Sequence, residues 1–404
     1  MEPVVEPATH VGYGRALASR EFRALFAGQT VSTTGTSVAA VALTILVFRR
    51  TGSPFLSALT FSLGFLPYVA GVAISGLVDR VRPRRLVVGC DSLACVIAAV
   101  MAWPGAPLAL LLGLLFCLGL LASVASGSRA SLVRATVAPD AYVPARSLLR
   151  IASQSAQIGG NAFGGALVVL LSPSGAILVN AASFLFSASV VRLLVADHPS
   201  AGEAGGANLL RDSLRGARDV FRRPELRRLL LLGWLGPMFS VAPEALAAPY
   251  VSGQHRSTAL IGIWLVALPL GVIVSDVVGI RFLTPGRQRR LMFPAAAAGF
   301  IPYLAFAGRP SVPVALALLV ASGLCGMYSL GLDGRLRDAA PERLFARTMM
   351  LNSAGLMSLQ GVGFALAGAV AQVTSPATAI VIAGVLGLAA VALLGRGELV
   401  GAPR

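Results

Sequence analysis

The chain has 404 residues, of which 56% are hydrophobic and only 12% charged, and its mean hydropathy is +0.79. A soluble domain carries about 25% charged residues to coat its surface, so this composition excludes a soluble enzyme, and it equally excludes a disordered chain. All 33 basic residues are arginine, and with 17 acidic residues they give a net charge of +16. Because lysine is absent, a P-loop ATPase and Schiff-base catalysis are excluded as well. The arginines lie in short clusters between apolar runs, which indicates an integral membrane protein and not a nucleic-acid-binding one.

Twelve apolar runs are long enough, at about 20 residues each, to cross a bilayer as helices. They lie near 24–48, 55–78, 86–103, 107–127, 150–171, 175–195, 229–250, 257–280, 291–307, 312–332, 348–371 and 376–395. One sizeable hydrophilic stretch divides them. We therefore expect an N-terminal six-helix bundle over 1–195, a cytoplasmic linker over 196–228 and a C-terminal six-helix bundle over 229–404.

The two halves resemble each other at a nearly constant offset. Residues 19–23, SREFR, precede the first run as 223–227, RPELR, precede the seventh, and Pro139 to Arg146 corresponds to Pro341 to Arg347. Duplication of a six-helix unit is typical of secondary transporters built from two parallel repeats. The sequence thus predicts an all-α membrane protein with twelve transmembrane helices in two pseudo-symmetric bundles.

Arginine placement predicts the orientation in the membrane. With both termini cytoplasmic, the external loops hold Arg49, Arg50, Arg256 and Arg309, and every other arginine is internal or at an internal boundary. We expect a monomeric, multi-pass protein of the cytoplasmic membrane with both termini in the cytoplasm.

Residues 75–85, SGLVDRVRPRR, connect the second and third predicted spans. The acid followed by a basic cluster, Asp79, Arg80, Arg84 and Arg85, resembles the signature loop of the major facilitator superfamily. The resemblance implies that the aspartate docks near a helix end of the opposite half, while the arginines form a charge network that holds the outward-facing state. The alternative is a loop that serves membrane topology alone.

Residues 159–165, GGNAFGG, lie in the fifth predicted span. They resemble the antiporter motif of efflux-type members, Gly-Pro-x-x-Gly-Gly, with Asn161 where proline is expected. Small residues at Gly160, Gly164 and Gly165 allow two helices to approach closely. Together with the PDAYVPARS stretch before this span, the pattern is similar to bacterial drug or siderophore exporters, and the resemblance implies export. Generic small-residue packing is the alternative.

Uncharged polar side chains inside the spans predict a substrate cavity, because hydrocarbon does not solvate them and they turn inward. The cavity residues expected from spans one, five and eleven are Gln29, Thr33, Thr36, Gln157, Asn161, Asn352 and Gln360. This lining suits a hydrophobic or amphipathic solute better than a sugar. The alternative is that the hydroxyl groups only bond carbonyls of their own helices.

Two acids inside the spans are candidates for proton coupling. Glu244 lies deep in the seventh predicted span between Pro243 and Pro249, where a desolvated carboxyl can take up and release a proton. Asp91 lies in the third span, and we expect it to pair with the nearby arginine cluster. Histidine and cysteine residues show no metal-like spacing, so we expect neither a metal nor a cofactor, only the proton gradient as the driving force.

We therefore predict a secondary active transporter, and not an enzyme, that exports a small hydrophobic or amphipathic solute by alternating access coupled to protons. An importer of a small metabolite and a transport-inactive sensor or scaffold of the same fold remain alternatives. A membrane-embedded enzyme would need paired acids or a His/Asp cluster at one membrane face, and the sequence offers none.

Overall fold

The computed structural model describes residues 13–67, 81–138, 141–199 and 218–399, and within these ranges every regular element is a helix. The first half contains α1 (Tyr13–Ala18), α2 (Arg20–Thr51), α3 (Pro54–Phe65), α5 (Pro83–Met101), α6 (Leu108–Thr136) and α7 (Tyr142–Leu194). The second half contains α9 (Pro224–Ser240), α10 (Ala242–Ala245), α11 (Ala247–Gly253), α12 (Ala259–Phe282), α13 (Pro285–Ala298), α14 (Ile301–Leu304), the 3₁₀ turn η2 (Ala305–Gly308), α15 (Val312–Gly323), α16 (Tyr328–Ala339), α17 (Glu342–Val373) and α18 (Pro376–Leu399).

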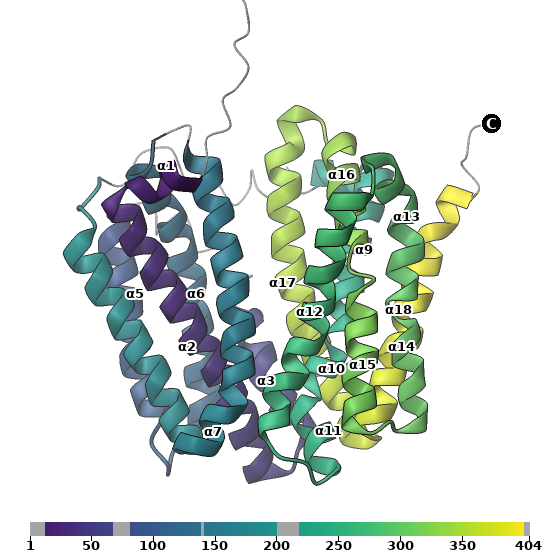
Figure 1. Ribbon diagram of the computed structural model, residues 1–404, viewed down its shortest axis with the longest axis horizontal. Coiled ribbons are helices and arrows are strands. Elements are labelled where there is room, and N and C mark those ends of the chain that lie inside the picture. The colour runs from purple at the N-terminus through teal and green to yellow at the C-terminus, as the bar shows by residue number, and fades with distance from the viewer. Residues whose placement is uncertain (1–12, 68–80, 139–140, 200–217, 400–404) are drawn as a thin grey trace, which may run out of the picture.

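The helices form two bundles that stand side by side, α1 to α7 and α9 to α18 (Figure 1). The bundles meet where α17 packs along α3 and α12 packs along α7. Helix α1 and the end of α18 lie at one face, at the top of Figure 1, which we call the terminal face. The turn between α2 and α3 belongs to the opposite face.

Capping groups and prolines set the helix ends. At the start of α2 the Phe22 N–H donates to the Ser19 hydroxyl at 3.2 Å, which satisfies one of the free donors of the first turn. The helix ends at Gly52, whose φ of 62° is left-handed and whose N–H bonds the Phe48 carbonyl. Proline stands in the first turn of α3, α5, α9 and α13, where its missing N–H costs nothing.

Helix α7 contains both the fifth and the sixth predicted spans. It is interrupted at Ser172, with φ 65° and ψ 165°, directly before Pro173. Proline cannot continue the hydrogen-bonding ladder, so the chain divides there into segments 142–171 and 173–194, close to the predicted boundaries.

Two turns, at Val241 and Leu246, divide the seventh predicted span into α9, α10 and α11. Side chains of neighbouring helices satisfy carbonyls near the breaks: Trp264 Nε1 donates to the Pro243 carbonyl and the Tyr303 hydroxyl donates to the Ser240 carbonyl, each at 2.8 Å. Such compensation is what makes interrupted helices tolerable inside a membrane protein.

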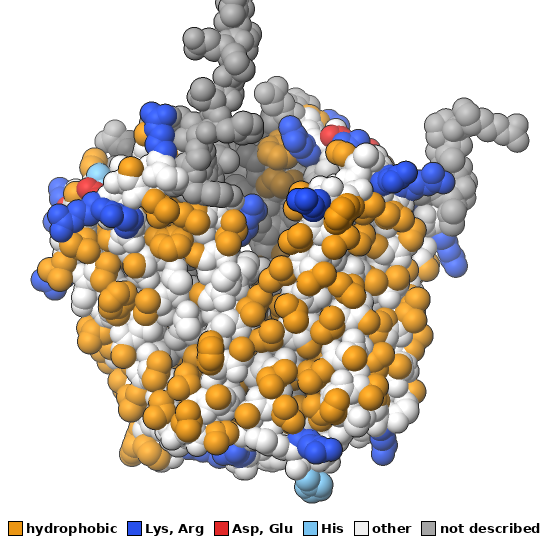
Figure 2. Space-filling model, viewed as in Figure 1, with side chains coloured by type: hydrophobic (Ala, Val, Ile, Leu, Met, Phe, Trp, Pro, Cys, Tyr) orange, Lys and Arg blue, Asp and Glu red, His pale blue; other side chains and the backbone are white. Residues whose placement is uncertain are grey.

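Nine helical segments within the described ranges are long and apolar enough to cross a membrane, and one of them, residues 145–194, contains two predicted spans. Helix α5 and the short α3 are not among them, and part of the second predicted span lies outside the described residues, so the count of twelve stays a prediction. Hydrophobic side chains cover the middle of the molecular surface, and arginines gather at its two edges (Figure 2). This distribution matches a bilayer belt with charged rims.

Candidate transport site

A cavity of about 660 Å³ lies in the first bundle, against the second. Its walls come from α2, α3, α5, α6 and α7, and among the described residues Glu244 of α10 is the single lining residue from the second bundle. Helices α2 and α7 supply mainly polar side chains, whereas α3 and α6 supply phenylalanine and leucine. The cavity therefore presents one polar and one apolar wall.

Five of the seven residues predicted to form the cavity line it, namely Gln29, Thr33, Thr36, Gln157 and Asn161. They converge because α2 and α7 pack along each other over much of their length. The amide of Gln29 reaches across this contact to the Ser153 hydroxyl at 3.5 Å.

The other two predicted residues do not line this cavity. Asn352 lies inside the second bundle, where its backbone carbonyl accepts from Trp234 Nε1 at 3.1 Å and its side chain stands against Gly233 of α9. Gln360 is likewise absent from the lining. Substrate contact by either residue stays a prediction for another conformation.

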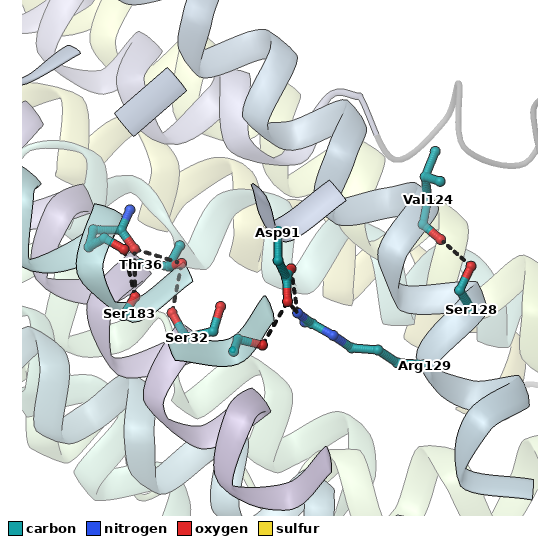
Figure 3. A network of polar contacts seen from close by, with 9 residues as sticks. Ser32, Thr36, Asp91, Val124, Ser128, Arg129 and Ser183 are labelled. Atoms are coloured by element: carbon teal, nitrogen blue, oxygen red, sulfur yellow. Dashed lines mark hydrogen bonds and ion pairs between the residues drawn. The ribbon is translucent and has the colours of Figure 1, made fainter. Parts of the chain in front are cut away.

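The threonine and serine hydroxyls of α2 bond their own helix and still face the cavity. Thr36 Oγ1 donates to the Ser32 carbonyl at 2.9 Å and lies 3.4 Å from Asn180 Oδ1, and Ser37 Oγ donates to a carbonyl one turn earlier at 3.0 Å. Asn180 in turn accepts from Ser183 Oγ, at 3.2 Å (Figure 3). Asn180, which the sequence analysis missed, therefore belongs to the polar wall.

Asp91 forms a buried ion pair with Arg129 at the cavity wall. Arg129 Nη2 lies 2.7 and 2.8 Å from the two carboxylate oxygens, and Ser187 Oγ donates to Oδ2 at 2.6 Å (Figure 3). The Asp91 side chain is 4% exposed. The expected pairing with the arginines at 84 and 85 is wrong, because α6 continues to Thr136 and carries Arg129 inside the helix, within reach of α5.

Glu244 reaches the cavity from the short helix α10, between two helix breaks. Among the described residues, no group donates a hydrogen bond to the Glu244 carboxyl or forms an ion pair with it. Burying an unpaired carboxylate in apolar surroundings costs much free energy, and burying its neutral, protonated form costs far less. The side chain is therefore able to hold a proton at the boundary between the bundles.

The glycines of residues 159–165 lie at two helix crossings. A Cβ on Gly160 would stand 2.6 Å from the Thr34 carbonyl oxygen, and one on Gly164 would stand 3.1 Å from the Val41 side chain, so both glycines face α2. Gly165 faces α12 of the other bundle, where a Cβ would stand 2.7 Å from the Ala259 oxygen. The motif therefore packs within the first bundle and also against the second.

Contacts between the bundles close the opposite face. Ser53 Oγ donates to Gln372 Oε1 at 2.7 Å, and Arg49 Nη2 donates to Thr258 Oγ1 at 3.4 Å. Deeper in, the rings of Phe61 and Phe364 stack with centroids 5.2 Å apart. The surface between the bundles is hollowed at the terminal face (Figure 2).

Comparison with known proteins identifies the family. The sequence matches the model of the Major Facilitator Superfamily over residues 25–327. The chain belongs to this superfamily. A stretch of 82 residues is 33% identical to Macrolide efflux protein A of Streptococcus pyogenes, and the match spans 20% of this chain and 20% of that protein.

Solved structures of the superfamily share the fold at low sequence identity. A bacterial homolog of the human lysosomal transporter Spinster, inward-facing and occupied, matches with a TM-score of 0.71 and 14% identity, over 94% of this chain and 96% of that one. A POT family transporter in complex with 5-aminolevulinic acid gives a TM-score of 0.72 and 12% identity over the same shares. These findings confirm the predicted fold class and a membrane transporter in place of an enzyme.

The superfamily's signature loop is described only in its last residues, since Asp79 and Arg80 lie outside the described ranges. Arg84 donates to the Arg192 carbonyl, and Arg85 lies 3.3 Å from Asp197. Arg82 donates to the same Asp197 carboxylate at 2.7 Å and holds the pKa of that carboxyl below its usual range. These contacts stay within the first bundle, and a gating role for Arg84 and Arg85 remains a prediction.

Proposed function

We propose that this protein exports a small hydrophobic or amphipathic solute from the cytoplasm, driven by the proton gradient. The observation that carries the proposal is the cavity of about 660 Å³, which has one polar and one apolar wall and is bounded by both bundles. The similarity of an 82-residue stretch to a macrolide efflux protein favours export over import.

The solute enters from the terminal face, and the arginine distribution supports a cytoplasmic location of this face and of both termini. Rocking of the bundles about the cavity then closes the terminal face and opens the opposite one. The close contact of Gly165 with α12 and the stack of Phe61 on Phe364 have to separate in that step. The protein acts in the cytoplasmic membrane as a monomer, since one chain supplies both bundles.

Glu244 is the leading candidate for the coupling acid. It belongs to the second bundle but lines a cavity formed by the first, so its protonation changes the cost of bringing the bundles together around it. Asp91 is the weaker candidate because Arg129 and Ser187 already stabilise its charged form. Proton uptake by Asp91 would have to disturb that ion pair.

The test uses inside-out membrane vesicles, amphipathic fluorescent probes with an acidic, a neutral and a cationic end group, and an imposed pH gradient. We expect gradient-dependent uptake by the unaltered protein, loss of the gradient dependence in Glu244→Gln, and no change in Asp219→Asn, an exposed acid away from the cavity. Full gradient-dependent uptake by Glu244→Gln would remove Glu244 from the coupling step. Solute leaving the vesicles in place of entering would establish import.

A further inference from the structure

The charges around the cavity are unevenly placed. Three arginines line it, Arg129 near the end of α6 and Arg146 and Arg150 in the first turns of α7, all toward the terminal face. The acids that line it are Asp91 and Glu244. Asp91 is already bound by Arg129 and Ser187, and Glu244 enters from α10 of the other bundle. The α7 arginines therefore meet no acid on the described cavity wall.

The guanidinium groups keep donors that can serve a ligand. Arg129 uses Nη2 for both oxygens of Asp91, and no described group accepts from its Nε or Nη1. Arg146 makes a long hydrogen bond, 3.4 Å, to the Tyr142 hydroxyl. The charge of Arg150 acts on Asp333 of α16, outside the lining, so a bound anion would compete with that carboxylate across the two bundles.

The opposite part of the cavity is apolar. Phe61 and Phe65 of α3 and Leu115 and Leu118 of α6 line it, and Phe61 and Phe65 both lie against the Phe364 ring. A ligand that satisfies both parts has an apolar body and one negatively charged end. Guanidinium groups bind such an end with directed, charge-assisted hydrogen bonds.

We propose that the cavity binds an amphipathic organic anion, an apolar body with a carboxylate-type end group held by Arg146 and Arg150. The proposal rests on the proposed export function and specifies its substrate class. A cationic solute would have to pass two arginines to reach Glu244, the one acid of the lining without a described partner. Like charges in a low-dielectric cavity repel strongly, so this order of groups disfavours cations.

The test compares three fluorescent probes with the same body: 11-(dansylamino)undecanoic acid, its neutral amide, and the analogue ending in trimethylammonium. Binding to the purified full-length protein in lipid nanodiscs is followed by dansyl fluorescence. We expect the acid to bind about ten-fold tighter than the amide, and the cation to bind weakest. Raising the salt concentration should weaken the binding of the acid alone, because screening reduces its attraction to the arginines.

Variants separate specific contacts from general surface charge. In Arg146→Ala/Arg150→Ala the acid should lose about ten-fold in affinity while the amide is unchanged. Arg281→Ala removes an exposed charge at the end of α12, outside the cavity lining, and should leave all three probes unchanged. Equal binding of the three probes, or tightest binding of the cation, would overturn the proposal.

Transport of the same probes tests the anion inference separately from the proposed export function. If inside-out vesicles take up the amide or the cation but not the acid, the protein is an exporter and the anion inference is wrong. If vesicles move none of the three probes under an imposed pH gradient, the export function itself is wrong. Uptake that favours the acid supports both.

Discussion

The crossing of α7 and α12 allows a test of the rocking motion with single methyl groups. An alanine at Gly165 would place its Cβ 2.7 Å from the Ala259 oxygen, and an alanine at Gly262 would place it 2.5 Å from the Asn161 oxygen. Ordinary contacts of a Cβ begin at 3.4 Å, so the helices have to separate by about 1 Å. Overpacking of this kind costs about 1–3 kcal/mol.

If α7 and α12 separate when the opposite face opens, the overpacking destabilises the closed conformation and leaves the open one unaffected. The equilibrium between the two conformations should then shift about 5- to 150-fold toward the open opposite face. The shift can be measured as a longer distance between spin labels on Gly105→Cys, in the turn after α5, and Gly308→Cys, at the end of η2, both exposed at the opposite face, in a background without the native cysteines.

Two neighbouring glycines provide matched controls. A Cβ on Gly159 meets no atom within 4 Å, so Gly159→Ala should leave the spin-label distance unchanged. It gains the same helix propensity as Gly165→Ala and so controls for that effect. A Cβ on Gly160 meets the Thr34 oxygen at 2.6 Å inside the first bundle, so Gly160→Ala should lower thermal stability without shifting the distance. If Gly165→Ala behaves like Gly159→Ala, the reasoning fails.

Three further outcomes follow from individual contacts. Asp91→Asn leaves Arg129 as an unpaired buried charge and should destabilise the protein by about 3 kcal/mol, and adding Arg129→Gln should restore part of the loss of melting temperature; no restoration would speak against the ion pair. Because the pKa of Asp197 is lowered by Arg82, its contribution to stability is present at neutral pH and is lost only as the pH falls through that lowered value. The melting-temperature difference between the parent and Asp197→Asn should thus stay constant from pH 8 to 5 and shrink below about pH 4, and a difference that already fades near pH 6 would contradict it. Gln372→Ala removes the exposed hydrogen bond from Ser53 and should favour the open opposite face about two- to five-fold, from a bond worth about 0.5–1 kcal/mol. An unchanged spin-label distance would count against that contact as a gate.

The sequence was sufficient for the features that depend on local pattern. Apolar runs and proline placed most helices, including the division of α7 at Ser172 and Pro173. Gln29, Thr33 and Thr36, predicted as cavity residues, recur along α2 at a spacing that puts them on one helical face, and the structure turns that face toward the cavity. Helical periodicity is enough for such an inference because every residue of the face belongs to one element.

Features that depend on how helices meet were missed. Arg129 falls just outside the fourth predicted span, 107–127, because charged residues normally mark the membrane edge, but a partner on α5 stabilises it inside the bundle. Asn180, Ser183 and Ser187 recur at i, i+3 and i+7 in an apolar run, and the sequence analysis did not use this short polar stripe. The roles of Asn180 and Ser187 come from contacts with α2 and α5. Asn352 shows the reverse case, a polar residue that the second bundle buries away from the cavity.

The one-sided lining of the cavity bears on how new specificities could arise in this protein. Among the described lining residues, Glu244 alone comes from the second bundle. Under the proposed function, the residues that select a solute and the candidate coupling acid therefore lie on separate stretches of one polypeptide. A chimera can join residues 1–195 of this protein to the C-terminal bundle of another superfamily member. It should keep the solute range of the protein that supplies residues 1–195. Selection could thus retune recognition through mutations in the N-terminal bundle while the energy source stays as it is.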